Sequence, residues 1–257
     1  DLKRLKPIFS EDLNGMQYSR FVRIVERDKK FDIEVCRGSI GYWATCKGER
    51  WVNIFKDSVN KFGLNFYPYE DVNFYYVDPT DKDNYIVLDE YFDRLKQARV
   101  NELQKIAQDL GAKKFRVTYM REKSSLIKKK WNGKADGKAK DGDGTVSVDG
   151  DKLSKQYDKV EIEAENSFPG HDPAEPHVRY LKYDQNVQNL IDMRMDTKGP
   201  INHQTLSIKL SSTSGLKEND AAKLDMILKS LKMAGNTTVL SEVQNEEKSI
   251  LKYEIEF

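Results

Sequence analysis

Two histidines and their acidic neighbours are the residues whose types and spacing could do chemistry. His171 and His177 share the segment PGHDPAEPHVRY with Asp172 and Glu175, while His203 lies elsewhere. Two imidazoles and a carboxylate could hold zinc with one position open for water, as in hydrolytic sites. However, there is no His-Glu-x-x-His motif and no cysteine pair of the kind that binds zinc. We therefore read the segment first as a proline-rich connector. A metal-dependent hydrolase using His171, Asp172 and His177 remains an alternative.

A second candidate group is basic. Residues 121–140 carry eight basic and two acidic side chains, and residues 141–165 carry eight acidic and three basic ones. A lysine cluster in a glycine-rich tip could bind phosphate backbones or anionic lipid. Opposite charges facing each other across a hairpin also explain the pattern, so nucleic acid or an anionic membrane is a possible partner that we do not favour. The candidate anion-binding residues are Lys128, Lys129, Lys130, Lys134, Lys138 and Lys140.

The remaining motifs are incomplete. GKADGKA lacks the spacing and the hydroxyl residue of a phosphate loop, and KDGDGTVSVDGD lacks the closing glutamate of a calcium loop. The sequence has no nucleophile elbow, dinucleotide fingerprint or kinase signature. We expect no cofactor and lean against an enzyme.

The charge balance and the cysteines limit the classes of protein to which the chain can belong. Lys plus Arg (43) nearly cancels Asp plus Glu (42), and no run of 18 apolar residues could span a bilayer. Cys36 and Cys46 are out of register for a disulfide in the hairpin expected around Gly38 to Gly41, so both should be free thiols. Free thiols favour a cytoplasmic location, although a start at Asp1 leaves a removed signal segment open.

The clearest secondary-structure element in the sequence is a long helix expected at 84–110. Asp83 or Asn84 could cap a long helix, and Gly111 is suited to its end. The flanking segments 72–77 and 113–120 have strand composition, so we expect the helix to pack on a sheet. The apolar stripe of the helix follows steps of three and four residues and comprises Leu88, Tyr91, Phe92, Leu95, Ala98, Leu103, Ile106, Ala107 and Leu110.

The N-terminal part, 17–78, is rich in short β-type runs and is expected to form an antiparallel meander. Its aromatic residues could form a stacking platform for bases or sugars, but we favour a core role because aromatics dominate core burial. They are Trp43, Trp51, Phe55, Phe62, Phe66, Tyr67 and Tyr69.

The second half of the chain is expected to contain a long charged hairpin at 113–167 and a short helix at 184–195. A strand at 205–210, a second helix at 219–234 and one long strand or hairpin over 236–257 complete it. The second helix would be capped by Asn219 or Asp220.

The sequence therefore predicts an α+β protein with a mixed or antiparallel sheet, on which the helices at 84–110 and 219–234 pack. We expect one domain over 1–257, within which strand, helix and strand could be duplicated at 72–128 and 205–252. The first functional hypothesis is a soluble, non-enzymatic protein that binds another protein. The alternatives are a membrane-active, pore-forming-like protein that remodels its strand–helix–strand segments, and the metal-dependent hydrolase.

Overall fold

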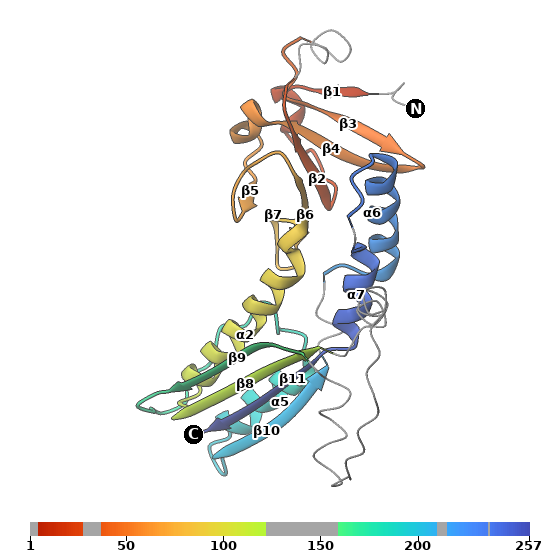
Figure 1. Cartoon of the computed structure of the whole chain (residues 1–257). Coiled ribbons are helices and arrows are strands. Elements are labelled where there is room, and N and C mark those ends of the chain that lie inside the picture. Colours follow the sequence, from red (N-terminus) through yellow and green to blue (C-terminus); the bar gives the residue numbers. More distant parts are fainter. Residues whose placement is uncertain (1–4, 28–36, 122–158, 210–214, 236) are drawn as a thin grey trace, which may run out of the picture. The chain divides into compact units, whose positions relative to one another are not determined.

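A computed structural model describes residues 5–27, 37–121, 159–209, 215–235 and 237–257 (Figure 1). It contains several helices and two β-sheets, which confirms the expected α+β class. The chain divides into two compact units. Unit 1 comprises Asp1–Lys96 and Gly215–Val239, and unit 2 comprises Gln97–Ser214 and Leu240–Phe257.

Unit 1 is built on a seven-stranded mixed sheet with the order β1-β3-β4-β2-β6-β7-β5. Strand β2 runs parallel to β4, and β5 runs parallel to β7, while the other neighbours are antiparallel. The expected antiparallel meander is therefore only partly correct. The strands are β1 (Lys6–Ile8), β2 (Phe21–Val25), β3 (Gly41–Cys46), β4 (Glu49–Phe55), β5 (Asn65–Tyr67), β6 (Phe74–Asp78) and β7 (Asp81–Val87).

A tight turn at Lys47 and Gly48 joins β3 to β4. Both residues have positive φ, 48° and 87°, as both central positions of a type I′ turn require. Cys46 lies at the end of β3 as a free thiol, whereas Cys36 lies outside the described residues. The 3-10 helices η1 (Ser10–Leu13) and η2 (Lys56–Lys61) also belong to this unit. The core of the sheet is formed by Ile8, Val22, Ile24, Ile40, Val52, Ile54, Val59, Phe62, Tyr75, Tyr85 and Val87.

Helix α6 also belongs to unit 1 and confirms the second expected helix, with bounds Glu218–Ser230. Its buried residues are Ala221, Leu224 and Ile227. An ion pair of 3.0 Å between Lys223 and Glu49 connects it to the sheet. Lys217 occupies the N-cap position, so the expected cap at Asn219 or Asp220 is wrong, because both residues lie in the first turn.

The long helix α2 (Tyr91–Asp109) begins later than the expected 84–110. Residues up to Val87 belong to β7, and Leu88–Glu90 forms the 3-10 helix η3. The expected cap at Asp83 or Asn84 is wrong because β7 pairs with both β5 and β6 over this stretch. The expected end is confirmed, since Gly111 has a φ of 82° just after the helix.

Unit 2 contains a four-stranded antiparallel sheet with the order β10-β11-β8-β9. Its strands are β8 (Lys114–Arg121), β9 (Lys159–Ser167), β10 (His203–Lys209) and β11 (Ile250–Glu256). Lys209, Ile250, Met120 and Val160 stand next to one another across the four strands. The connections from β8 to β9 and from β10 to β11 therefore both leave the sheet at this end.

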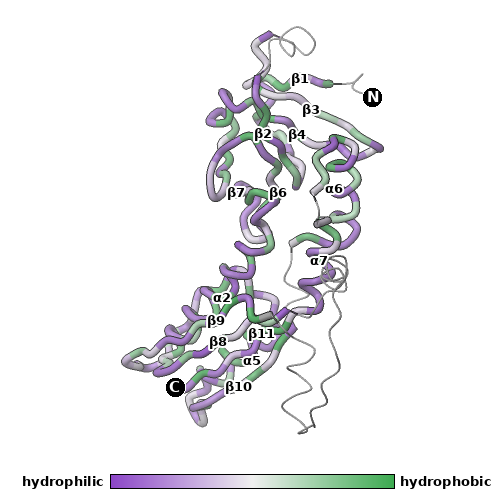
Figure 2. The backbone as a smooth tube through the Cα atoms, in the orientation of Figure 1, coloured by the Kyte–Doolittle hydropathy of each residue, from purple (hydrophilic) through white to green (hydrophobic). Residues whose placement is uncertain are grey.

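Helices α2 and α5 (Gln185–Met195) cover one face of this sheet. The carboxylate of Asp184 caps α5 by accepting the backbone N–H groups of Asn186 and Val187 at 2.9 and 3.0 Å. Buried and more exposed residues alternate along β8 and β11, and residues of contrasting hydropathy follow one another along the backbone of this sheet (Figure 2). The face turned away from the two helices is therefore polar. The core comprises Val100, Leu103, Ile106, Ala107, Leu110, Ala112, Phe115, Val117, Tyr119, Leu181, Val187, Leu190, Ile208, Leu251, Tyr253, Ile255 and Phe257.

The segment 236–257 is not one long strand or hairpin. Helix α7 (Val239–Glu247) precedes β11. The residues Val239, Val243 and Glu246 are buried at steps of four and three, which is the spacing of a helix face. The mixture of polar and apolar residues at these steps hid the helix from a search for apolar residues alone.

The long hairpin and the duplication are only partly visible. Strands β8 and β9 pair at the base of the expected hairpin, whereas 122–158 lies outside the described residues. Arg116 and Glu165 form an ion pair across these strands at 3.1 Å, as expected for opposite charges on the two arms. The strand expected at 72–77 corresponds to β6, which lies in a different sheet from β8, while β10 and β11 are neighbours, so the duplication of 72–128 and 205–252 is not confirmed.

Candidate functional site

The predicted metal residues lie in an irregular segment between β9 and α5. Nδ1 of His171 lies 2.6 Å from the backbone oxygen of Asp172, and both side chains are exposed. The segment packs closely against the end of α2. A Cβ added to Gly111 would lie only 2.0 Å from the backbone oxygen of His171. Ala174 also donates its N–H to the backbone oxygen of Asp109 at 2.8 Å. The segment is thus an ordered connector.

The described residues contain a different group that could hold a metal ion. Ligand atoms of His203, Glu254 and Glu256 all lie within 4.8 Å of one another, whereas His171, Asp172 and His177 form no such group. Sequence reasoning missed the three residues because the glutamates lie 51 and 53 positions after the histidine. Strand pairing brings them together, since His203 is opposite Glu256. The metal site at His171, Asp172 and His177 stays a prediction. In the described residues, the ligand atoms of these three side chains do not come together.

The six lysines predicted to bind anions, Lys128, Lys129, Lys130, Lys134, Lys138 and Lys140, lie outside the described residues. Their role stays a prediction.

The aromatic residues of the N-terminal part divide into two groups. Trp51, Phe55 and Phe62 are buried, as a core role predicts. Tyr67 and Tyr69 are 55% and 50% exposed, which the core hypothesis did not anticipate. Alternation along β5 explains the division, because Phe66 packs inward against two buried tyrosines while its neighbour points outward.

We call residues 67–72, which comprise the last residue of β5 and the five residues after it at the edge of the seven-stranded sheet, the aromatic loop. Val72 is 41% exposed, so three large apolar side chains gather within six residues. Few such side chains are exposed elsewhere in the described residues: Val160, Tyr183, Met193 and Met233 are the others, and they are dispersed along the chain. A local concentration of exposed aromatic residues is typical of an interaction surface.

Tyr75 fastens the aromatic loop to the sheet. Its ring is fully buried, and its hydroxyl oxygen accepts the N–H of Asp71 at 2.9 Å. The same hydroxyl lies 3.0 Å from the backbone oxygens of both Tyr69 and Asp71, to either of which it can donate. Burial raises the pKa of Tyr75 above the ordinary tyrosine value, so the hydroxyl keeps the proton that it donates.

An ion pair holds the loop from outside. Lys56 lies 2.7 Å from the carboxylate of Asp71, whose pKa is lowered chiefly by this hydrogen bond. The same oxygen, Oδ1 of Asp71, also accepts the backbone N–H of Val72 at 2.8 Å. Side-chain and backbone contacts together fix the loop conformation, while its aromatic rings stay exposed.

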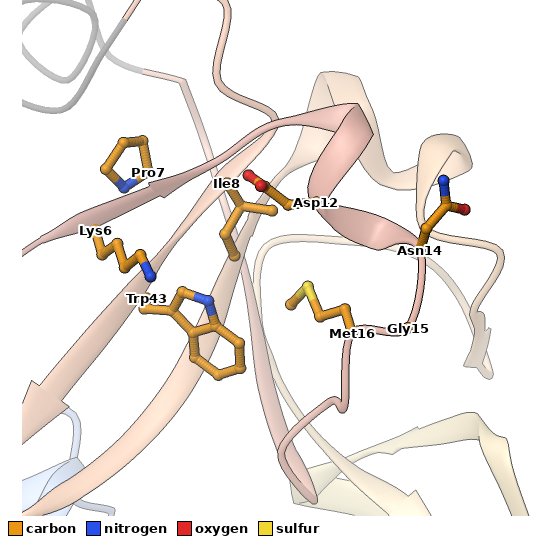
Figure 3. A pocket seen from close by; sticks show the side chains of 8 residues that line it. All are labelled: Lys6, Pro7, Ile8, Asp12, Asn14, Gly15, Met16 and Trp43. Carbon is orange, nitrogen blue, oxygen red and sulfur yellow. The ribbon is translucent and has the colours of Figure 1, made fainter.

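A small pocket lies at the opposite edge of the same sheet, beside β1 (Figure 3). Its volume is about 240 Å³, below the roughly 300 to 1,000 Å³ usual for small-molecule sites. The guanidinium of Arg50 lies 3.8 Å from the ring centroid of Trp43, so one face of this indole is already occupied. The pocket is lined by Lys6, Pro7, Ile8, Asp12, Asn14, Gly15, Met16 and Trp43.

Comparisons with family models, with curated proteins and with solved structures find no match to this chain. In the part of the chain that the structure describes, no helix combines the length and the apolar character needed to cross a membrane.

Proposed function

We propose that this chain is a non-enzymatic binding protein that contacts another protein through the aromatic loop. The observation that carries the proposal is the exposure of Tyr67, Tyr69 and Val72 on one short, firmly held loop. Tyrosine is enriched among the residues that dominate binding energy, because it combines a large apolar ring with a polar tip.

The anchoring of the loop favours binding in a second way. A flexible loop loses conformational entropy when it is ordered at an interface, which weakens association. Tyr75 and Lys56 already hold the backbone and the carboxylate of Asp71 in the free chain. The exposed rings are therefore presented with little further ordering cost.

The chemistry of the loop defines the partner surface. The apolar rings require an apolar patch, and the exposed Glu70 adds a negative charge at the rim. Lys56 already pairs with Asp71, whereas Glu70 forms no ion pair with another described residue. We expect a partner protein with an apolar patch bordered by basic side chains.

A pull-down with matched variants tests this proposal. The double variant Tyr67→Ser/Tyr69→Ser removes both rings, and Tyr183→Ser removes an 88% exposed tyrosine from unit 2 as the control. The expected result is a protein captured by the parent and the control but not by the double variant. The purified pair should then show at least about tenfold weaker affinity for the double variant. Equal capture by all three proteins would exclude the aromatic loop as the binding surface.

The topology of unit 2 favours a second candidate function. Both connections of the four-stranded sheet leave it at the end marked by Met120, Val160, Lys209 and Ile250. Two segments leaving one end of a sheet could lengthen its strands in the same direction, as the membrane-active hypothesis requires. Dye release from anionic and neutral lipid vesicles tests it. We would abandon this candidate if vesicles stay intact at protein concentrations that saturate their surface.

A further inference from the structure

We propose that His203, Glu254 and Glu256 form a site for a divalent transition-metal ion such as Zn²⁺ on the polar face of the four-stranded sheet. This site is independent of the aromatic loop, which belongs to unit 1. The three side chains come from the neighbouring strands β10 and β11 (Figure 1). Their ligand atoms, one imidazole nitrogen and two carboxylate oxygens, lie within 4.8 Å of one another.

Strand register explains the convergence. His203 is directly opposite Glu256, and Thr205 is directly opposite Glu254. Residues two apart on a strand share a face, so both glutamates project to the side of the histidine. The backbone ladder fixes the three Cα positions, and a metal ion would have to order only the side chains.

The spacing is close to that of a bound ion. Zinc bonds of about 2.0 to 2.2 Å at tetrahedral angles place neighbouring ligand atoms roughly 3.4 Å apart. The side chains must therefore close by on the order of 1 Å, which exposed or half-buried glutamates can do by rotation. The two carboxylates repel each other at this separation, and a divalent cation would remove the repulsion.

A neighbouring hydroxyl fixes the imidazole. Oγ1 of Thr205 lies 3.1 Å from Nε2 of His203. If Nε2 carries the proton and donates it to this hydroxyl, Nδ1 is left with its lone pair for a metal ion. Metal-bound histidines characteristically donate their other ring N–H to an oxygen in this way.

The chemical types of the three ligands determine which ions the site favours. An imidazole nitrogen suits zinc, copper, nickel and iron, whereas magnesium and calcium prefer ligand sets made only of oxygen. Three protein ligands leave a fourth tetrahedral position for water. A competing cation is already present, because Nζ of Lys114 lies 3.2 Å from Oε2 of Glu256.

Titration of the full chain with Zn²⁺, and with Co²⁺ as a spectroscopic probe, tests the site. We expect Co²⁺ to gain the visible absorption of a four- or five-coordinate ion. Each of the variants His203→Gln, Glu254→Gln and Glu256→Gln should weaken binding at least about tenfold. Lys114→Gln should tighten binding, because it removes the ammonium group that competes for Glu256.

Two controls separate this site from others. Glu163→Gln removes an exposed carboxylate from the same face of the sheet, on β9, and should leave Zn²⁺ affinity unchanged. His171→Gln should also leave it unchanged. Loss of binding in His171→Gln, binding that survives His203→Gln, or no binding by the parent would each overturn the proposal. Melting temperatures near that of the parent verify that the variants are folded.

Discussion

Arg99 of α2 and Glu246 of α7 form an ion pair inside unit 2, and their side chains are 0% and 2% exposed. Within the described residues, Nε and Nη2 of Arg99 and Oε2 of Glu246 have no hydrogen-bond partner. The pair is thus isolated from solvent and only partly satisfied. Such a pair contributes little net stability, but each charge depends strongly on the other.

Removal of one partner should therefore destabilise the fold strongly. We expect Glu246→Leu to lower the free energy of unfolding by about 3 to 5 kcal/mol, because it leaves the Arg99 guanidinium buried without a counter-charge. The double variant Arg99→Met/Glu246→Leu should recover most of this loss. Urea unfolding of the single and double variants measures both values. A single variant within about 1 kcal/mol of the parent would mean that water reaches the guanidinium.

A single carboxylate on α2 should stabilise the segment before α5. Glu102 accepts the backbone N–H groups of Arg179, Tyr180 and Leu181 at 2.6, 3.2 and 2.7 Å. Glu102→Ala leaves these donors without their acceptor and should cost about 1 to 3 kcal/mol in urea unfolding. Asn101→Ala, at the exposed neighbouring position, is the control and should change stability by less than about 0.5 kcal/mol. Similar values for both variants would show that water replaces the carboxylate.

Gly111 should tolerate no side chain. Its φ is 82°, and a Cβ would lie 2.0 Å from the backbone oxygen of His171. Gly111→Ala should therefore cost about 2 kcal/mol or more and should increase proteolysis of the connector that contains His171. The control is Gly199→Ala, since no atom lies within 4 Å of a Cβ at Gly199. Thermal unfolding and limited proteolysis compare the two, and equal melting temperatures would contradict the close contact.

Tyr253 should make the protein sensitive to alkali. Burial raises its pKa to about 12. Between pH 10 and 12 the unfolded tyrosine loses its proton while the folded one keeps it, so the free energy of unfolding falls by about 1.4 kcal/mol per pH unit. Below pH 10 this contribution to stability is fully present. Urea midpoints measured from pH 8 to 12 should show the decline.

The variant Tyr253→Phe supplies the control. It should lose less stability above pH 10 than the parent, because other buried tyrosines, including Tyr85 and Tyr42, still titrate with raised pKa values. At pH 7 it should be as stable as the parent or slightly more stable, since no partner for the Tyr253 hydroxyl lies among the described residues. Identical pH profiles for the two proteins would assign the decline to those other tyrosines.

Local pattern predicted the helices well where their buried residues are apolar. The stripe of α2 and the position of α5, expected at 184–195 and found at Gln185–Met195, follow from side-chain spacing within a few residues. Helix α7 escaped detection because Ser241 and Glu246 belong to its buried face, and Glu246 is tolerated there by a partner 147 residues away. A local pattern contains no information on such a partner.

Local pattern was also insufficient to predict the candidate sites, because their residues depend on strand pairing between distant segments. Phe66 and Tyr67 are adjacent aromatic residues, but alternation along the edge strand β5 turns Phe66 toward Tyr75 and leaves Tyr67 55% exposed. His203 meets its glutamates only through the β10–β11 register, which depends on a connection of 40 residues between the strands, 210–249. Sequence spacing could therefore suggest His171 and His177, which are close in the chain, and could not suggest the group at His203.

The four-stranded sheet of unit 2 cannot be completed until β11 has been synthesised. Strand β11 lies between β10 and β8, although it follows all other described elements in the chain. Before residues 250–256 leave the ribosome, β8 and β10 have a gap between them that no other described strand fills. The half-built sheet then exposes the strand edges and apolar faces that aggregation requires. We expect nascent chains of this protein to need protection by chaperones until β11 is inserted.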